Sequence, residues 1–562
     1  MMVAKRAHVY PQVEPGVEGW PDLGVASLPR RASVREALDL ARRRRSAVLA
    51  LGGGTDFVLR EDLARAEGLG LADMAAADLR RPLPVIESRA SEITLRRHLA
   101  GGAPIVVVRD RRGPRRAAAA DTSPVRGPSL ARELATMPSL RALAETVAAA
   151  AAARGARAFL VGGVVRELLR RGPVVFRDVD VVVEGDAPAV ARDVAVALGG
   201  RLVEHDRFLT ASVEGTAHGR IDLATARFER YEAPGALPRV VPASLGADLG
   251  RRDFTVNAMA LALERSDGWL VDPLGGREDL ARRRLRVLHP LSFVEDPTRL
   301  FRAARYAARL DFTEDAWTGR CRALALRRVP YPALSGQRLL AEVGLILDEA
   351  RPEVALTRLG RTGVYALLDP RYRFTQRTAG RLDELPAARA WAAHRAVAVS
   401  AVELTVLVLL ADQKADVADA AVRRLGFAGE PAARLGRALR EGPALAARLA
   451  HATTPSARAA TLRDRAALDL VWLWLAGGPE LRPALDWFAG ARQVRPALGG
   501  DDVIALGVPR GRDVARVLAE LRDARLDGGV DDRVSEIEYV RRWVREEQGG
   551  PGLRAAPPPK EG

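Results

Sequence analysis

LVGGVVREL (Leu160 to Leu168) and RDVDVVVE (Arg177 to Glu184) are the two stretches that decide how this 562-residue sequence is interpreted. The first is an apolar strand that ends in Gly162 and Gly163 and leads into an amphipathic helix carrying Arg166. Glycines allow close approach to the backbone, amides at a helix start attract phosphate, and arginine binds phosphate oxygens in a bidentate manner. The glycines alone are typical of an ordinary strand-to-helix turn, but beside an acidic strand they predict a phosphate site.

The second stretch carries Asp178 and Asp180 two residues apart, so a strand would place both carboxylates on one face. Adjacent carboxylates repel each other unless a cation lies between them, and oxygen ligands suit Mg²⁺. We therefore predict a magnesium site at Asp178 and Asp180. The alternative is a capping role for Asp178 with Asp180 merely solvated, which is the commoner use of an isolated Asp-x-Asp pair.

Composition narrows the class of protein. The length predicts several domains, and a hydrophobic fraction of 48% excludes a wholly disordered chain. One cysteine, Cys321, excludes a disulfide framework and a cysteine-based zinc cluster, so we expect a cytoplasmic protein. The most apolar window, Ala396 to Ala411, contains Glu403 and is too short to span a bilayer, so we expect no membrane association. The net charge of +16 favours a polyanionic partner, although arginine runs such as Arg42 to Arg45 also suit solvated helix faces.

Changes in pattern along the chain predict a multidomain α+β protein. Two similar α/β half-units begin with SVREALDLARRRR (Ser33 to Arg45) and SEITLRRHLAGGAPIVVVRDRRG (Ser91 to Gly113), and Ser33 with Glu36 forms a predicted capping box. Mixed strands and turns follow, and then an almost wholly helical pattern. The predicted segments are a leader at 1–24, the repeat at 25–123, a small mixed-sheet domain at 129–270, helical segments at 271–350 and 351–548, and a disordered tail at 549–562.

Two further stretches carry groups that suit nucleotide binding. RRDFTVNA begins with Arg251, Arg252 and Asp253 and then offers Asn257, a set that suits a triphosphate and ribose pocket. Asp296, Arg299 and Arg302 recur at helical spacing, so they share one helix face and can present donors and acceptors to the edge of a base. The alternatives are a surface helix start for the first stretch and an intrahelical ion pair for the second.

Together these stretches resemble, in order over roughly 129–544, the motifs of the class II tRNA nucleotidyltransferases and bacterial poly(A) polymerases, within the polymerase-β-like nucleotidyltransferases. The first family motif pairs a Gly-Gly-x-Val-Arg turn with an Asp-x-Asp strand. The later motifs are matched by RRDFTVNAMAL (Arg251 to Leu261), DPLGGREDL (Asp272 to Leu280), EDPTRLFRAARYAARL (Glu295 to Leu310) and the Arg-x-Glu-x-Tyr pattern of Arg227, Glu229 and Tyr231. A later helix has Gln337 where the family has an acid, so we interpret Arg338 as structural.

The resemblance implies a template-independent enzyme that uses Mg²⁺ to add AMP, with or without CMP, from ATP and CTP to the 3′ end of tRNA. It implies a catalytic head at 129–270, a nucleotide-selecting neck at 271–350 and an RNA-binding body and tail at 351–548. The implied catalytic residues are Asp178, Asp180 and Asp222, with Asp178 and Asp180 as the metal ligands. The implied nucleotide-binding residues are Gly162, Gly163, Arg166, Arg251, Arg252, Asp253, Asn257, Asp296, Arg299 and Arg302. Two alternatives stay open: a poly(A) polymerase acting on RNA 3′ ends, and a nucleotide-sensing or RNA-binding protein with an inactive core.

The repeat at 25–123 resembles a pair of CBS domains, the regulatory modules named after cystathionine β-synthase. The matching stretches are SVREALDLA, FVLREDLARAEGLGL (Phe57 to Leu71) and APIVVV. Asp62 stands where such domains hold a nucleotide ribose, but Leu59 replaces the usual hydroxyl residue before it. We therefore expect this pair to orient RNA or to form a homodimer rather than to bind a ligand.

Overall fold

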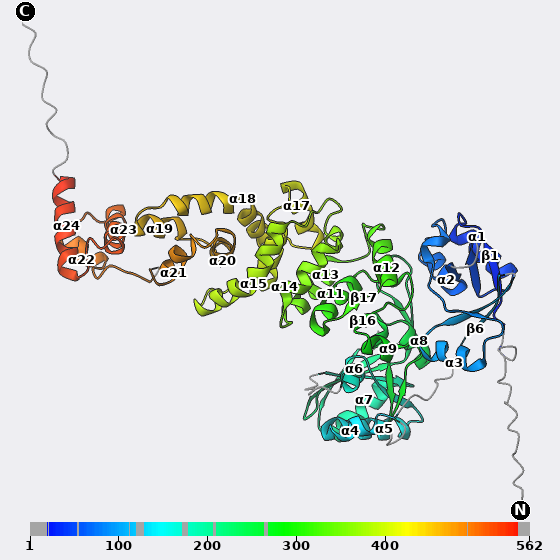
Figure 1. Ribbon diagram of the computed structural model, residues 1–562. Coiled ribbons are helices and arrows are strands. Elements are labelled where there is room, and N and C mark those ends of the chain that lie inside the picture. Colours follow the sequence, from blue (N-terminus) through cyan, green and yellow to red (C-terminus); the bar gives the residue numbers. More distant parts are fainter. Residues whose placement is uncertain are drawn as a thin grey trace, which may run out of the picture. The chain divides into compact units, whose positions relative to one another are not determined.

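The computed structural model describes residues 20, 22–52, 56–111, 113–119, 129–170, 178–205, 209–263, 268–491 and 493–548 (Figure 1). Nearly all of the predicted leader and the whole of the predicted tail lie outside these residues. The chain divides into two compact units, and the division falls between Pro370 and Arg371. The boundaries that we expect within the first unit stay predictions, and each unit is described by itself.

The N-terminal part of the first unit, residues 22–119 without its undescribed positions, is built from two halves with the same connectivity. We call it the N-terminal module. The first half contains β1 (Val25–Leu28), α1 (Val34–Arg43), β2 (Val48–Leu51), β3 (Asp56–Leu59), α2 (Arg60–Gly68) and the 3₁₀ helix η2 (Ala76–Leu79). The second contains β4 (Val85–Glu87), α3 (Glu92–Ala100), β5 (Ile105–Asp110) and β6 (Gly113–Ala119). In each half the first two strands are parallel and the third is antiparallel to the second.

Both halves contribute to one apolar core. Buried side chains of β2 and β3 pack with those of β5 and β6, through Val48, Ala50, Phe57, Leu59, Ile105, Val107 and Ala117. The predicted capping box is present at the start of α1, where Ser33 and Glu36 satisfy each other's backbone amides. The two half-units therefore bury their sheets against each other, as paired repeats do.

A seven-stranded mixed sheet follows. Its region contains α4 (Ala131–Ala135), α5 (Pro138–Ala153), β7 (Arg157–Val161), α6 (Gly163–Arg170), β8 (Asp178–Glu184), α7 (Ala187–Leu198), β9 (Arg201–His205), β10 (Thr210–Thr216), β11 (Gly219–Thr225), β12 (Arg227–Arg230), β13 (Arg239–Pro242), α8 (Leu245–Gly250), η4 (Thr255–Asn257), β14 (Ala260–Ala262) and β15 (Trp269–Val271). The strand order in the sheet is β15-β14-β7-β8-β11-β10-β9. β8 lies between β7, to which it is antiparallel, and β11, to which it is parallel. We refer to this region as the head.

Side-chain alternation in β8 decides what each face of the head sheet carries. Val179, Val181 and Val183 point to one face and are buried there. Val182 points to the other face, where it packs with Leu245 and Leu249 of α8. Asp178 and Asp180 are four and two residues before Val182, so their side chains point to the same face of the sheet as Val182. Both carboxylates therefore lie on the face that α8 covers, beyond the end of the apolar core on that face.

A second group of elements, the neck, completes the first unit. It contains α9 (Gly276–Ala281), β16 (Arg284–Leu285), α10 (Ser292–Glu295), α11 (Thr298–Leu310), β17 (Thr313–Glu314), α12 (Ala316–Leu326), α13 (Gly336–Leu347), α14 (Pro352–Arg361) and η5 (Val364–Leu367). α11 packs against α13 and α14 and buries nine of its residues, Arg299 among them. A helix with so much of its surface covered holds its polar side chains in fixed positions.

The second unit is helical throughout its described residues. Its elements are α15 (Gln376–His394), α16 (Ala401–Leu410), α17 (Ala415–Arg424), α18 (Gly429–His451), α19 (Pro455–Leu462), α20 (Ala467–Ala476), α21 (Arg482–Ala491), α22 (Gly500–Ala505), α23 (Arg512–Leu526) and α24 (Arg533–Gln548) (Figure 1). The last three share a core that includes Val503, Leu521 and Trp543. This pattern agrees with the expected change from mixed sheet to helices.

No helix among the described residues is both long enough and apolar enough to cross a membrane.

One buried ion pair holds α2 to the segment that connects the two halves of the N-terminal module. Arg81, which follows η2, donates to both carboxylate oxygens of Asp62 on α2, at 2.6 and 2.8 Å, and Asp62 is only 1% exposed. Both carboxylate oxygens of Asp62 are thus already engaged within the protein.

Asp62→Ala should therefore destabilise the module strongly, because the buried Arg81 loses both hydrogen bonds to a carboxylate and keeps only the exposed Glu61, 3.8 Å away, as a counter-charge. We expect the free energy of opening of α2 and β3 to fall by roughly 3–5 kcal/mol, measured by native-state hydrogen exchange of their amides. Asp73→Ala is the matched control, since it removes an exposed pair with Arg35 and should cost less than about 1 kcal/mol. Equal effects of the two substitutions would contradict the structural role of the Asp62–Arg81 pair.

Candidate functional site

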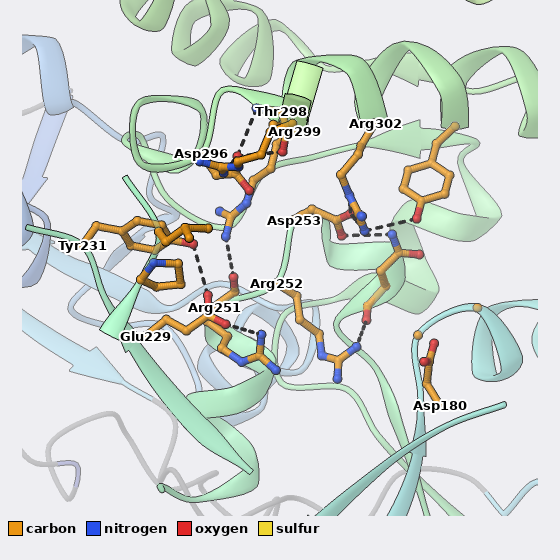
Figure 2. A pocket seen from close by; sticks show the side chains of 17 residues that line it. Asp180, Glu229, Tyr231, Arg251, Arg252, Asp253, Asp296, Thr298, Arg299 and Arg302 are labelled. Atoms are coloured by element: carbon orange, nitrogen blue, oxygen red, sulfur yellow. Dashed lines mark hydrogen bonds and ion pairs between the residues drawn. The ribbon is translucent and has the colours of Figure 1, made fainter. Parts of the chain in front are cut away.

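A pocket of about 360 Å³ lies between the head and the neck (Figure 2). Its lining contains five arginines and four acids, which makes it polar and nearly balanced in charge. The lining residues are Gly162, Gly163, Asp180, Glu229, Tyr231, Leu237, Pro238, Arg251, Arg252, Asp253, Asn257, Asp296, Thr298, Arg299, Arg302, Tyr306 and Arg338. Its volume falls within the roughly 300–1,000 Å³ that is usual for small-molecule sites.

Ten of the thirteen residues that the sequence singles out line this pocket. They are Gly162, Gly163, Asp180, Arg251, Arg252, Asp253, Asn257, Asp296, Arg299 and Arg302. The other three, Arg166, Asp178 and Asp222, are not among the lining residues. Residues from three separate motifs are thus brought together, while the three others lie close behind or beside the lining.

The glycine turn places backbone beside the acidic strand. Gly162 has φ +68°, a left-handed conformation that glycine adopts without strain, and it joins β7 to α6. A Cβ atom built on Gly162 would lie 3.5 Å from both Oδ2 of Asp180 and Nη1 of Arg252. The turn therefore lies between an acid and an arginine, and its backbone forms part of the pocket wall.

Three carboxylates approach one another where β8 meets β11. In this parallel pair Asp180 stands opposite Asp222, and Asp178 stands opposite Arg220. The pKa of Asp180 is raised, first by its recessed position and then by Asp222 and Asp178, although Arg252 partly offsets this. Water still reaches the Asp180 carboxylate, which faces the pocket. A cation beside Asp180 would relieve this repulsion.

Asp222 is held differently from the other two acids. Its Oδ1 accepts hydrogen bonds from Ser212 Oγ and from Arg220 Nε, the latter at 2.9 Å. Asp178 begins β8 and is exposed, directly after undescribed residues 171–177. Within the part of the chain that the structure describes, no group of three or more His, Cys, Asp or Glu side chains is arranged to hold a metal ion. The donor set that this geometry offers is thus the pair Asp178 and Asp180, with Asp222 engaged by its own partners.

A buried acid behind the pocket holds two of the lining arginines, Arg251 and Arg252, in place. Asp248 is completely buried and accepts from Arg251 Nη2 at 2.6 Å and from Arg252 Nη2 at 3.0 Å. Burial alone would raise the pKa of Asp248, but Arg252 and Arg251 more than offset this and lower it. Arg251 also donates to Glu229 at 2.7 Å. Both guanidinium groups are therefore held in place at the pocket wall.

Asp253 is the centre of a second buried network. Its Oδ2 accepts from Arg302 Nε at 2.8 Å, and its Oδ1 accepts from Asn257 Nδ2 at 3.0 Å. Arg166 is buried behind the lining and donates to Oδ1 of Asn257. Tyr306 lies beside this network, with Arg302 donating to its hydroxyl at 3.4 Å. Arg166 thus positions Asn257 in the structure.

Asp296 and Arg299 are fixed by separate partners at the start of α11. Oδ1 of Asp296 accepts from Thr298 Oγ1 at 2.7 Å and from Arg338 Nη2 at 2.8 Å. Arg299 is buried and donates to Ser292 Oγ at 2.8 Å and to the carbonyl oxygen of Arg251 at 2.7 Å. Figure 2 shows both side chains on the side of the pocket away from Asp180. The pocket thus has an acidic end and an end with paired donors and acceptors.

Several residues at this site escaped the sequence prediction. Arg338, which we interpreted as structural, lines the pocket and contacts Asp296. Asp248 stands three and four residues before Arg251 and Arg252, a helical ion-pair spacing that could have identified it. Glu229 and Tyr231 were quoted only for their pattern, yet both line the pocket, and the Tyr231 hydroxyl donates to Glu229 at 3.1 Å.

This arrangement suits a nucleoside triphosphate chemically. Arginines neutralise phosphate oxygens and bind them in a bidentate manner. Fixed carboxylate and guanidinium groups can hydrogen-bond the edge of a base. The fold and the pocket therefore indicate a nucleotide-binding protein, with Asp180 beside Arg252 at one end of the pocket.

Comparison with known proteins agrees with this class. Residues 158–286 match the family model described as the Poly A polymerase head domain. A CC-adding tRNA nucleotidyltransferase of Deinococcus radiodurans is 35% identical over 68% of this chain and 89% of that protein. An A-adding tRNA nucleotidyltransferase of Halalkalibacterium halodurans is 41% identical over 37% of this chain and 49% of that protein.

A solved structure is similar over most of the chain. The Thermotoga maritima CCA-adding enzyme complexed with tRNA has a TM-score of 0.61 and 26% identity, and the match covers 74% of this chain and 98% of that one. The chain spans only about a quarter to a half of the length of the A-adding relatives that it matches. Because the match to the Deinococcus protein extends over nearly all of that relative, this chain belongs to the class II tRNA nucleotidyltransferase family.

The Asp253 network gives a pH-dependent prediction. Burial alone would raise the pKa of Asp253, but Arg302, Asn257 and Arg299 lower it from 3.8 to about 2. Because the folded-state pKa is depressed, its stabilising contribution is complete above pH 3.8 and is lost as the pH falls towards 2. Asp253→Asn should therefore lower the free energy of unfolding by roughly 2–3 kcal/mol at pH 7.

The difference between wild type and Asp253→Asn should shrink as the pH is lowered from 5 to 2, followed by denaturant unfolding. Asp311→Asn serves as the control, because Asp311 and Arg283 form a largely exposed pair. A difference that is small at pH 7, or that does not change with pH, would show that Asp253 is not stabilised as a carboxylate.

Proposed function

We propose that this chain is a template-independent nucleotidyltransferase that adds AMP, and CMP if it is CCA-adding, from ATP and CTP to the 3′ end of tRNA. One observation carries the proposal: a single pocket combines the acidic strand end, the paired arginines and the Asp296–Arg299 turn. Relatives named as A-adding and CC-adding tRNA nucleotidyltransferases support the substrate class. A similar structure complexed with tRNA supports tRNA as the acceptor.

Asp178 and Asp180 are the proposed ligands of Mg²⁺. Magnesium is usually bound by one or two protein carboxylates, with waters and substrate phosphates completing its shell. Two carboxylates on one face of β8 fit this requirement, and the pKa of Asp180 is raised by its recessed position and then by its acidic neighbours. When bound, Mg²⁺ supplies positive charge that neutralises the triphosphate and favours the deprotonated RNA 3′-hydroxyl. Asp222 is proposed as the third catalytic carboxylate, held by Arg220 and Ser212.

The chain's own residues divide the remaining work. Arg251 and Arg252, fixed by Asp248, bind and neutralise the triphosphate. Asp253 and Asn257, held in one network, orient the ribose. Asp296 and Arg299 hydrogen-bond the edge of the base, so that the protein rather than a template selects the nucleotide. Arg166 acts through Asn257, and Gly162 and Gly163 let the phosphates approach the backbone.

Parts outside the pocket have proposed roles as well. Residues 351–548 are proposed to bind the RNA by its backbone and shape. The N-terminal module is proposed to be a degenerate CBS pair, supported by its two equivalent halves, and homodimer formation through it stays a prediction. Because the proposed substrates are tRNA and nucleoside triphosphates, the proposed location is the cytoplasm.

The poly(A) polymerase alternative is supported by the match to the Poly A polymerase head domain. The two activities differ in what they add and where they stop. The test is to supply ATP and CTP separately to tRNA lacking the whole CCA end, tRNA lacking only the terminal A, complete tRNA and an unrelated RNA, and to sequence the 3′ ends. Long A tails on any RNA would favour the polymerase, and no addition to any RNA would favour a core that only binds nucleotides.

Asp178→Ala combined with Asp180→Ala should reduce nucleotide incorporation by at least about 100-fold, because charge stabilisation at the reacting phosphate is lost. Incorporation of labelled ATP into tRNA measures this. Binding of tRNA should change little, since neither residue lies in the helical unit. Asp193→Ala, which removes an exposed pair with Arg154 on the same domain, is the control and should keep wild-type activity. Wild-type incorporation by the double variant would refute the metal assignment.

A further inference from the structure

Several contacts join the N-terminal module to the neck among the described residues, and four of them show how the module is held. Trp317 Nε1 donates to the carbonyl oxygen of Arg80 at 3.2 Å, and Arg327 pairs with Asp78 at 3.1 Å. The other two contacts involve segments that belong to the nucleotide-binding motifs. One is a backbone contact between two glycine turns, and the other is an ion pair with the residue next to Asp296.

The glycine turns pack backbone against backbone. Gly102 follows α3 with φ +82°, and a Cβ atom there would lie 2.2 Å from the carbonyl carbon of Leu274. Gly275 has φ +73°, and a Cβ atom there would lie 2.3 Å from the carbonyl oxygen of Gly101. No side chain fits at either position. The module therefore packs directly against the DPLGG segment (Asp272 to Gly276), which leads into α9.

The ion pair joins Arg65 of α2 to Glu295 of α10, with Nη1 3.0 Å from Oε1. Glu295 is 2% exposed, so its charge needs a cation at close range. His289 Nε2 lies 3.3 Å from the other carboxylate oxygen, but burial and then Arg65 lower the pKa of His289 to about 4. A neutral imidazole leaves Arg65 as the nearest positive partner of Glu295 among the described residues.

Glu295 belongs to the turn that holds both base-contacting side chains. It ends α10, whose first residue, Ser292, binds the guanidinium group of Arg299. The next residue is Asp296, whose amide donates to the carbonyl oxygen of Ser292 at 3.3 Å. The carbonyl oxygen of Glu295 accepts from the amide of Gly235 at 3.1 Å. A movement of Glu295 would therefore move Asp296 and the anchor of Arg299 together.

We propose that the N-terminal module positions the nucleotide-selecting turn, and that Arg65 is a positioning residue that acts through Glu295. The inference rests on the proposed function, since it concerns selection at the same pocket. It gives the module a role in catalysis that needs neither a bound ligand nor a second copy of the chain. Arg65 does not line the pocket, so its effect on nucleotide binding is indirect, and its contact with Glu295 leads to the turn at 292–296.

A rival explanation is that Arg65 only helps to dock the module. Arg327 tests this, because its pair with Asp78 joins the same two parts of the chain and does not line the pocket. A docking role predicts that losing either arginine lowers stability, more so for the buried Arg65–Glu295 pair than for the exposed Arg327–Asp78 pair, without changing how the nucleotide binds. A positioning role predicts that only the loss of Arg65 changes how the nucleotide binds.

The experiment compares Arg65→Gln, Arg65→Lys and Arg327→Gln in the full chain, with KM and kcat for ATP and for CTP measured below the thermal midpoint of every variant. Arg65→Gln should raise the KM for the incorporated nucleotide about 5-fold or more and reduce discrimination between ATP and CTP, with a smaller change in kcat. Arg65→Lys keeps the charge and should recover most of this loss. Arg327→Gln should stay within about 2-fold of wild type for both constants.

Glu295→Gln alone and combined with Arg65→Gln closes a double-mutant cycle. If the pair acts as one unit, the double variant should be no worse than the worse single variant. It also removes both charges, so the cycle remains informative if Arg65→Gln folds poorly. An unchanged KM in Arg65→Gln, equal effects of Arg65→Gln and Arg327→Gln, or additive effects in the cycle would each overturn the inference.

A failure of the proposed function would be seen separately. If the wild-type protein binds ATP but adds nothing to any RNA, the same variants are compared by the dissociation constant for ATP in equilibrium dialysis. A selective loss of affinity in Arg65→Gln would then still support the positioning role. Equal affinities in all variants would overturn it.

Discussion

The pocket depends on how positive charge is held in place. Five arginines surround one cavity, and unpaired they would repel each other and disperse into solvent. Asp248, completely buried, fixes Arg251 and Arg252, and Asp253 fixes Arg302. The acids neutralise part of the charge, so the guanidinium groups are ordered before a nucleotide arrives. Binding energy is then not spent on arranging them, which is the advantage of a preorganised site.

The head sheet provides the opposite charge in the same place. Side chains alternate between the two faces of β8, so Val182 packs with α8 on one face. Asp178 and Asp180 lie on the same face, at the start of the strand. The parallel pairing with β11 adds Asp222 opposite Asp180. Repulsion among these acids is unfavourable for the protein alone, and sites that keep such strain commonly use it for function. The neck then closes the cavity with Asp296 and Arg299, and the N-terminal module contacts the turn that holds them.

Much of the site could be predicted because its residues occur in short, ordered motifs. The spacing of Asp178 and Asp180, the glycine turn and the helical spacing of Asp296 and Arg299 are local features, and local geometry follows from the period of a strand or helix. Arg166 shows what that reasoning does not reach: the structure places this motif residue behind the lining, where it donates to Asn257, and its predicted contact with phosphate stays a prediction. Arg338 and Glu229 show the converse, because their roles depend on partners that are distant in sequence.

The sequence by itself determined the family-like order of motifs, the change from mixed sheet to helices and the repeated halves at the N-terminus. Each follows from patterns within a few tens of residues. Only the tertiary structure decided which motif residues face the cavity, that Asp62 is paired with Arg81, and that Arg65 contacts Glu295. Those contacts join residues that are far apart along the chain. The partner of a buried charge is decided by which elements pack together, and the periodicity of the sequence does not show which elements those are.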